Sequence, residues 1–490
     1  MDIKNNFKKL YINDFINIFI LLFFTFVTQF SSLNIEIINW DLGSFLTVSD
    51  EIQRGNLIYD QQAESKSPLL FYILSFLSTV LNRNFLFIKI TFDILIFIIS
   101  TLIYANSLFL TKSKLKALLT SLVFLSFLSI YPYGHSESWE LFSIIFILSA
   151  LYIQNKIIYT GRESYMSYFL IGIYLSCATL ISTSTFIFSI PFFLFSFKHN
   201  KRNFLKYLSG LSLPWIIFWL IYLVNNLLLE FIYFNFLILF KYRSGNSEIL
   251  NKTIDNFKIL TFNQYEVANL FTIFMNIFNT LIILFSLYLV FNLMKKNYKD
   301  TNYQLVILSI LFYIIAGKGY FHHLFFFFSF APLIFNKIKN KKSFYFLITV
   351  LFLNICIFSF KNFENSLDNI TRTNLMINEY PLYNFYRDNL DLIDENVLAL
   401  NHPLLLFYFN SPNLKYYVHP TFENFTLSQK EKSLEQLLSI RPNVIICSES
   451  LLNKCKSLNG YSYNYTEFKT SYDYLYNYDV HLFKKSSKDK

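Results

Sequence analysis

The stretch FLFIKITFDILIFIISTLIYANSLFL, residues 85–110, decides the fold class of this chain. It is longer than the about 20 apolar residues that a helix needs to cross the hydrocarbon layer of a membrane. Ten further apolar runs are candidate spans, and the 490-residue chain is 54% hydrophobic, with 60 Phe and only 10 Gly. Ordinary soluble domains do not have this composition. The sequence therefore predicts a polytopic α-helical membrane protein.

Basic residues between the apolar runs predict the orientation. Short Lys and Arg clusters, typical of cytoplasmic loops, lie at residues 4–9, 112–116, 156–162, 198–206, 295–299 and 337–342. They place the N-terminus inside and the C-terminal tail outside a cell membrane, the plasma membrane in a bacterium. About eleven spans result, near residues 14–33, 85–110, 115–133, 139–155, 165–181, 184–197, 207–227, 268–294, 303–317, 320–336 and 343–360. The net charge of +10 thus belongs to inner loops, and we expect no binding to nucleic acid.

Three segments are predicted to lie flat at the outer surface. Residues 42–52 place apolar side chains on one helical face, with Asp50 and Glu51 elsewhere. The thirteen-residue apolar run 69–81 is too short to span. The segment 231–243 is the third candidate.

After Phe360 the composition becomes polar, which predicts a separate outer α/β domain over residues 361–490. Strands are expected at 396–400, 443–447 and 478–483, with a helix opening at the capping box of residues 428–431 and another after Ser448. The membrane domain, residues 1–360, then includes the first outer loop, 34–84. The sequence leaves open whether Cys447 and Cys455 in the tail form a disulfide.

The first outer loop carries a series of polar motifs. It reads Trp40-Asp41-Leu42-Gly43, then Arg54-Gly55-Asn56-Leu57-Ile58-Tyr59-Asp60, then Glu64-Ser65-Lys66-Ser67-Pro68. The loop resembles that of the GT-C superfamily, the membrane glycosyltransferases that use a polyprenyl-phosphate sugar, such as protein mannosyltransferases and aminoarabinose transferases. Leu42 and Ser67 depart from the pattern, because relatives often carry Glu and a second Pro there.

The resemblance implies a role for several residues of this loop. Asp41 would be the base that takes the proton of the acceptor, although an Asp directly before a helix also suits an N-cap. Lys66 would bind the phosphate of the donor, although a lysine at a membrane boundary also snorkels. Tyr59, Asp60 and Glu64 would contact substrate, although the first two also suit a turn.

Two later motifs extend the implied site. The fourth span begins at His135-Ser136-Glu137-Ser138-Trp139-Glu140. Glu140 would contact substrate, although the helix dipole also favours a carboxylate at this position. Lys318-Gly319-Tyr320-Phe321-His322-His323 begins a late span. There the resemblance implies a second phosphate contact, Lys318, and a polar contact, His322.

No cofactor is certain from the sequence. Some relatives use a divalent metal ion, for which Glu64 and His322 are weak candidate ligands. Adjacent residues of a helix point to different faces, so we expect His322 and His323 not to share a metal.

The resulting prediction is an inverting membrane glycosyltransferase that moves a sugar from a polyprenyl-phosphate carrier to a lipid, protein or cell-surface glycan. A transporter or flippase of lipid-linked glycans is an alternative that predicts charges inside the spans and interrupted helices. A non-catalytic membrane scaffold is another. The sugar, the acceptor, the carrier length and the oligomeric state cannot be deduced from the sequence.

Overall fold

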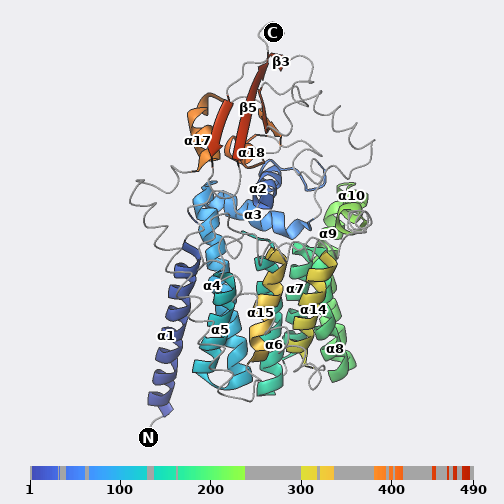
Figure 1. The fold of residues 1–490 in the computed structure, drawn as a ribbon. Helices are drawn as coiled ribbons and strands as arrows, with labels where there is room; N and C mark the ends of the chain where they lie inside the picture. The colour runs from blue at the N-terminus through green and yellow to red at the C-terminus, as the bar shows by residue number, and fades with distance from the viewer. Residues whose placement is uncertain are drawn as a thin grey trace. The chain divides into compact units, whose positions relative to one another are not determined.

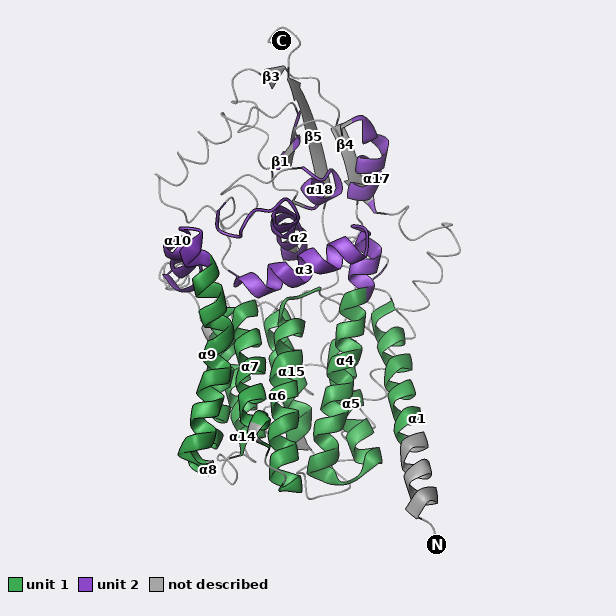
Figure 2. Cartoon of the chain, turned by 180° about the vertical axis from the view of Figure 1, so that it is seen from behind, with its two compact units in different colours: residues 1–32, 91–221, 243–365 green, residues 33–90, 222–242, 366–490 purple. Residues whose placement is uncertain are grey.

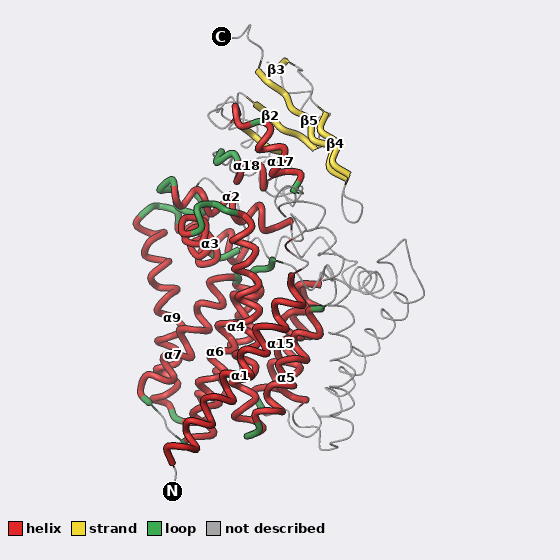
Figure 3. Tube along the Cα trace, turned by 90° about the vertical axis from the view of Figure 1, so that its left-hand side faces the viewer, coloured by secondary structure: helices red, strands yellow, loops and turns green. Residues whose placement is uncertain are grey.

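The computed structural model describes residues 3–30, 33, 40–60, 66–129, 137–161, 164–237, 300–316, 321–335, 380–392, 397–400, 403–411, 444–448, 461–462, 467–471 and 477–485. These residues are mostly helical, with one small sheet (Figures 1 and 3). They form two compact units (Figure 2). Unit 1 contains residues 1–32, 91–221 and 243–365, and unit 2 contains residues 33–90, 222–242 and 366–490.

Unit 1 is a bundle of helices that run lengthwise beside one another (Figure 2). Helix α15 packs against α5, α6 and α14, and α6 packs against α7. The bounds of the helices that lie wholly or mostly in this unit are α1 Ile3–Gln29, α4 Phe85–Thr111, α5 Lys114–Leu128, α6 Glu140–Thr160, α7 Tyr165–Ile181, η3 Thr183–Ser189, α8 Ile190–His199, α9 Lys201–Val224, α14 Thr301–Ala316, η5 Phe321–Leu324 and α15 Phe325–Phe335.

Large apolar side chains remain exposed along the helices of this unit. Helix α1 exposes Phe15, Phe19, Phe23 and Phe26, and α9 exposes a similar series that ends in Val224. The spacing on α1 places these rings on one side of the helix. A continuous apolar surface of this kind is costly in water but is suited to contact with lipid chains. The predicted location in a membrane is therefore supported.

Three helices are long and apolar enough to cross a membrane, namely Phe85–Thr111, Glu140–Thr160 and Lys201–Val224. Apart from α5, the other described helices that match predicted spans contain shorter apolar helices. Predicted spans 268–294 and 343–360 lie outside the described residues. The number of crossings and their orientation therefore stay predictions.

The predicted span 184–197 is not one regular helix. A 3-10 helix, η3, comes first, and α8 follows with Pro191 in its first turn. The Thr185 hydroxyl donates to the Ala178 carbonyl at 2.9 Å, so this threonine joins η3 to the end of α7. Because a 3-10 helix rises about 2.0 Å per residue, η3 and α8 together reach about 29 Å, close to the thickness of the hydrocarbon layer.

Helices α7 and α9 meet at two glycines. A Cβ atom added to Gly172 would lie 2.3 Å from the Tyr207 carbonyl oxygen, and one added to Gly210 would lie 2.1 Å from that of Phe169. Trp215 Nε1 donates to Thr179 Oγ1 at 2.8 Å farther along the same two helices. Small residues allow such close backbone approach between membrane helices.

Unit 2 combines the first outer loop with the C-terminal residues. Its helices are α2 Trp40–Gln53, α3 Pro68–Val80, α10 Leu228–Ile232, the π-helix η4 Tyr233–Leu237, α17 Pro381–Asp388, η7 Leu390–Leu392 and α18 Pro403–Tyr408. Helix α18 packs against both α2 and strand β1. The predicted division at residue 360 assigned the first loop to the membrane domain, whereas in the structure this loop groups with the C-terminal residues.

The sheet of unit 2 has five strands, β1 Val397–Leu400, β2 Val444–Ser448, β3 Tyr461–Ser462, β4 Glu467–Ser471 and β5 Asn477–Lys485. Strand β1 pairs with β2 in parallel, in the register Val397 to Val444. Strand β5 is antiparallel to β2, β3 and β4. The three predicted strands are confirmed to within two residues. The predicted helices at residue 428 and after Ser448 lie outside the described residues.

Two of the three segments predicted to lie flat at the outer surface contain the helices α2 and α3, and their position at a membrane surface stays a prediction. Helix α3 has Ser67 as N-cap and Pro68 at its first position, a favoured place for proline. In helix α2 residues 42–51 are all buried, Asp50 and Glu51 included. Both carboxylates are buried because each has a cationic partner, as described below. Of the third segment, 231–243, the structure describes residues up to 237, in α10 and η4.

Candidate functional site

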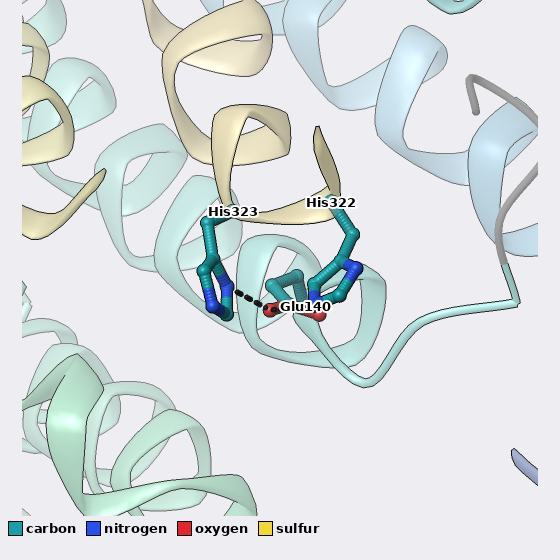
Figure 4. Close-up of side chains that lie close together, drawn as sticks. All are labelled: Glu140, His322 and His323. Atoms are coloured by element: carbon teal, nitrogen blue, oxygen red, sulfur yellow. Dashed lines mark hydrogen bonds and ion pairs between the residues drawn. The ribbon is translucent and has the colours of Figure 1, made fainter. Parts of the chain in front are cut away.

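Three side chains that can bind a ligand converge in unit 1 (Figure 4). Glu140 is the first residue of α6 and is 0% exposed. His322 and His323 come from η5, the short 3-10 helix that leads into α15, and both are partly buried. We call these residues the Glu-His-His cluster.

One carboxylate oxygen of Glu140 faces both histidines. His323 Nδ1 lies 2.8 Å from Glu140 Oε1, a hydrogen-bond distance, and His322 Nε2 lies 3.9 Å from the same oxygen. The other oxygen, Oε2, accepts a hydrogen bond from the Ser138 hydroxyl. The Glu140 carboxylate therefore has a fixed orientation, with Oε1 directed at the two imidazoles.

The sequence led us to expect that His322 and His323 would not share a metal, and in the structure both imidazoles approach the same oxygen of Glu140. The two rings lie on either side of the Glu140 carboxylate (Figure 4), with centroids 4.5 Å apart. One ligand atom from each of the three residues lies within 4.8 Å of the others.

In unit 2, Asp41 and Lys66 lie at the starts of the two loop helices. Asp41 is in the first turn of α2, which begins at Trp40, so the alternative role as an N-cap does not hold. Lys66 precedes the N-cap of α3 by one residue. Among residues 41–51, only Asp41 is partly exposed, and Lys66 is partly exposed beside the buried Ser67 and Pro68.

Tyr59 is buried and supports the backbone at Lys66. Its hydroxyl donates to the Lys66 carbonyl at 2.7 Å and accepts from Asn235 Nδ2 at 3.0 Å. Its ring stacks on Phe234, with centroids 5.4 Å apart. The backbone of Tyr59 is left-handed, with φ 74°, a conformation that costs a non-glycine residue about 1 kcal/mol or more. The sequence predicted Tyr59 as a substrate contact. In the structure its side chain is 0% exposed, and its hydroxyl binds the backbone just before α3.

Sequence reasoning missed a buried charge cluster in the same unit. Asp50 is 1% exposed and pairs with Arg83, whose Nη2 lies 2.7 Å from Oδ2. Burial, the largest effect, raises the pKa of Asp50 to about 6, although the charge of Arg83 lowers it. Glu51 pairs with Arg54 and accepts from Asn56 Nδ2 at 2.8 Å. One signal was present, since both arginines lie in the loop predicted to be on the outer side, where basic residues are disfavoured.

Both arginines also bind the segment 403–411. Arg83 donates to the Phe407 carbonyl, and its guanidinium lies 4.5 Å from the Phe407 ring centroid. Arg54 Nη2 donates to the Asn410 carbonyl at 2.7 Å and to its side-chain oxygen at 3.1 Å. The first loop is thus attached to the C-terminal residues through buried or half-buried ionic groups.

The other predicted site residues are less informative. Asp60 is partly buried in the turn closed by its own N–H and the Leu57 carbonyl, at 3.2 Å. Glu64 and Lys318 lie outside the described residues, so their predicted roles, including that of Glu64 as a metal ligand, stay predictions.

The sequence matches no protein-family model and no curated protein. The structure is similar to crystal structures of ArnT from Cupriavidus metallidurans. The one bound to undecaprenyl phosphate has a TM-score of 0.46 and 11% identity, covering 95% of this chain and 97% of that chain. The apo structure has a TM-score of 0.47 and 10% identity, covering 94% and 96%.

The likeness to ArnT is a likeness of structure alone. TM-scores below 0.5 at this identity do not transfer an activity or a substrate to the present chain.

Proposed function

We propose that this protein is a membrane glycosyltransferase that moves a sugar from a polyprenyl-phosphate carrier to an acceptor on the outer side of the membrane. The observation that carries the proposal is the selective exposure of the two motif residues. In helix α2 residues 42–51 are all buried, whereas Asp41 in its first turn is partly exposed, and Lys66 is partly exposed just before α3. A carboxylate and an ammonium group are thus available to substrate at the starts of two packed helices.

The proposed reaction is a single displacement with inversion. The acceptor hydroxyl or amine attacks the anomeric carbon while the bond from that carbon to the phosphate oxygen breaks. Asp41 takes the proton that the acceptor loses, and the carrier phosphate leaves with the bonding electron pair. Lys66 stabilises the charge that develops on this phosphate, which is the type of interaction that contributes most to such catalysis. Lys318 is the proposed second phosphate contact.

Tyr59 supports this assignment for Lys66. Its hydroxyl fixes the Lys66 backbone, so the lysine side chain starts from a defined position. Preorganisation of this kind reduces the entropy lost when the donor binds. The other residues that the loop motif predicts, Asp60 and Glu64, would then line the sugar or the acceptor, and contacts from Glu140 and His322 stay predictions.

The test is transfer of radiolabelled sugar from a panel of polyprenyl-phosphate sugars, in membranes that contain the wild type or Asp41→Asn. We expect incorporation by the wild type and a loss of about a hundredfold or more in the variant, as for removal of a general base. Asp388→Asn on α17, an exposed aspartate, is the matched control and should be fully active. Equal transfer by wild type and Asp41→Asn would refute Asp41 as the base.

A second assay distinguishes the proposed transferase from the main alternative, a transporter or flippase. The interruption between η3 and α8 is a feature of the kind found in transporters. A flippase in proteoliposomes would move the labelled lipid from one leaflet of the bilayer to the other without forming a new glycosidic bond. Such movement in the absence of transfer would overturn the proposal.

A further inference from the structure

We propose that the Glu-His-His cluster, Glu140, His322 and His323, is a binding site for a divalent transition-metal ion, zinc by the nature of its ligands. This inference does not depend on the proposed function. It replaces the weak pair Glu64 and His322 with three residues that the structure brings together, and it includes His323, which sequence reasoning had excluded.

The separations of the ligand atoms fit one small ion. Zinc binds imidazole nitrogen and carboxylate oxygen at about 2.0–2.2 Å, so neighbouring ligand atoms of a tetrahedral site are about 3.3 Å apart. The observed separations from Glu140 Oε1 are 2.8 Å to His323 Nδ1 and 3.9 Å to His322 Nε2, on either side of that value. All three ligand atoms lie within 4.8 Å of one another, so side-chain shifts of up to about 1.5 Å would complete the triad.

The charge of the cluster also favours a cation. Glu140 is 0% exposed, and an ionised carboxylate that is removed from water needs a positive partner. A bound dication is one such partner. A dication would balance the carboxylate and leave both histidines neutral, which is the form that binds metal.

The surroundings resemble the outer shell of a metal site. The Ser138 hydroxyl binds the second oxygen of Glu140, an arrangement that orients a ligating carboxylate. The Phe312 ring meets His323 edge to face, with centroids 5.8 Å apart, and forms an apolar wall. Aromatic contacts from Phe326 to Phe312 and Phe188 extend that wall. These contacts restrict the imidazole before any ion arrives.

Three protein ligands leave a coordination position open. Sites of two histidines and one carboxylate commonly have water or substrate in the fourth position. A bound ion there would attract an anionic oxygen, such as that of a phosphate. The identity of this fourth ligand rests on the proposed function, but the binding of the metal does not.

The test measures metal directly. The full-length protein is purified in detergent, treated with EDTA, and titrated with Zn²⁺ at pH 7.5 by calorimetry and by competition with a chromophoric chelator. We expect one zinc ion per chain. His322→Ala and His323→Ala should each lower the affinity by a hundredfold or more, and Ser138→Ala by 10–100-fold as for other outer-shell groups. His481→Ala in β5 is the control and should bind zinc like the wild type.

Folding and ligand identity are checked separately. Thermal unfolding in EDTA should be the same for wild type and His322→Ala, so that any loss of binding is not a loss of structure. X-ray absorption at the zinc edge should show two imidazole nitrogens at about 2.0–2.1 Å. Absence of stoichiometric zinc at micromolar concentration, or unchanged affinity in both histidine variants, would overturn the proposal. Binding of Mg²⁺ in preference to Zn²⁺ would overturn it as well.

Discussion

Arg83 and Asp50 form an ion pair, Nη2 to Oδ2 at 2.7 Å, between the segment after α3 and helix α2, in which Asp50 is buried and Arg83 is partly exposed. The same guanidinium donates to the Phe407 carbonyl. One side chain therefore joins both helices of the first loop to the C-terminal residues of unit 2. Its removal would leave a carboxylate that is 1% exposed without its nearest cation.

Arg83→Met should strongly destabilise unit 2 at pH 7. Loss of one partner of a buried ion pair typically costs about 3–5 kcal/mol, because the other charge stays buried. The expected result is a lower unfolding temperature in detergent and faster proteolysis around residues 403–411. Arg387→Met, a replacement of an exposed arginine on α17, should change neither. A stable Arg83→Met protein at pH 7 would contradict the importance of this pair.

Asp50 should make stability depend on pH in a defined direction. Its pKa is about 6 in the folded protein, against 3.8 for a free side chain, so the folded state binds the proton more tightly. Its contribution is therefore most favourable below pH 4 and is lost as the pH rises through 6, by about 3 kcal/mol in total. Asp50→Asn keeps an oxygen acceptor for Arg83 but does not titrate.

The measurement is thermal unfolding of wild type and Asp50→Asn between pH 4 and 8. The wild type should gain stability relative to the variant as the pH falls from 7 to 5. A constant difference between the two proteins across this range would show that Asp50 has an ordinary pKa.

Tyr59→Phe should weaken donor binding more than the chemical step. The substitution keeps the ring contact with Phe234 but removes the hydroxyl that joins Lys66 to Asn235. A hydrogen bond of this kind contributes about 1 kcal/mol, so KM for the polyprenyl-phosphate sugar should rise about fivefold with kcat little changed. Tyr386→Phe on α17 is the matched control. A fall in kcat at constant KM would place Tyr59 in the chemical step instead.

Gly210→Ala should separate helices α7 and α9. The added methyl group would collide with the backbone of Phe169, which cannot move as a flexible side chain would. Overpacking of this kind costs about 1–3 kcal/mol or more, and the unfolding temperature in detergent should fall accordingly. Ser209→Ala, at an exposed neighbouring position, should be neutral. An unchanged unfolding temperature would mean that the two helices can shift apart at little cost.

The sequence predicted the features that depend on local pattern. The apolar run at 85–110 became α4, the run after Pro68 became α3, and Val444 lies in a buried strand, because hydrophobic periodicity and length largely determine such elements. Asp41 and Lys66 were found through the motif, and the structure gives each partial exposure.

Features that depend on distant partners were missed. The burial of Asp50 was missed because its cation, Arg83, lies 33 positions farther along the chain. The approach of His323 to Glu140 joins residues 183 positions apart, and no local pattern encodes that distance. Helix α18 escaped notice because its burial comes from α2 and β1 and not from its own periodicity.

The way the two loop arginines bind the segment 403–411 has an evolutionary consequence. Arg83 binds the main-chain carbonyl of Phe407, and Arg54 binds that of Asn410. Every residue type offers such a carbonyl, so this segment can accept many substitutions and still be recognised. The arginines have no comparable freedom, because lysine lacks the planar group that serves two acceptors at once. Homologues should therefore diverge quickly on one side of this attachment and slowly on the other.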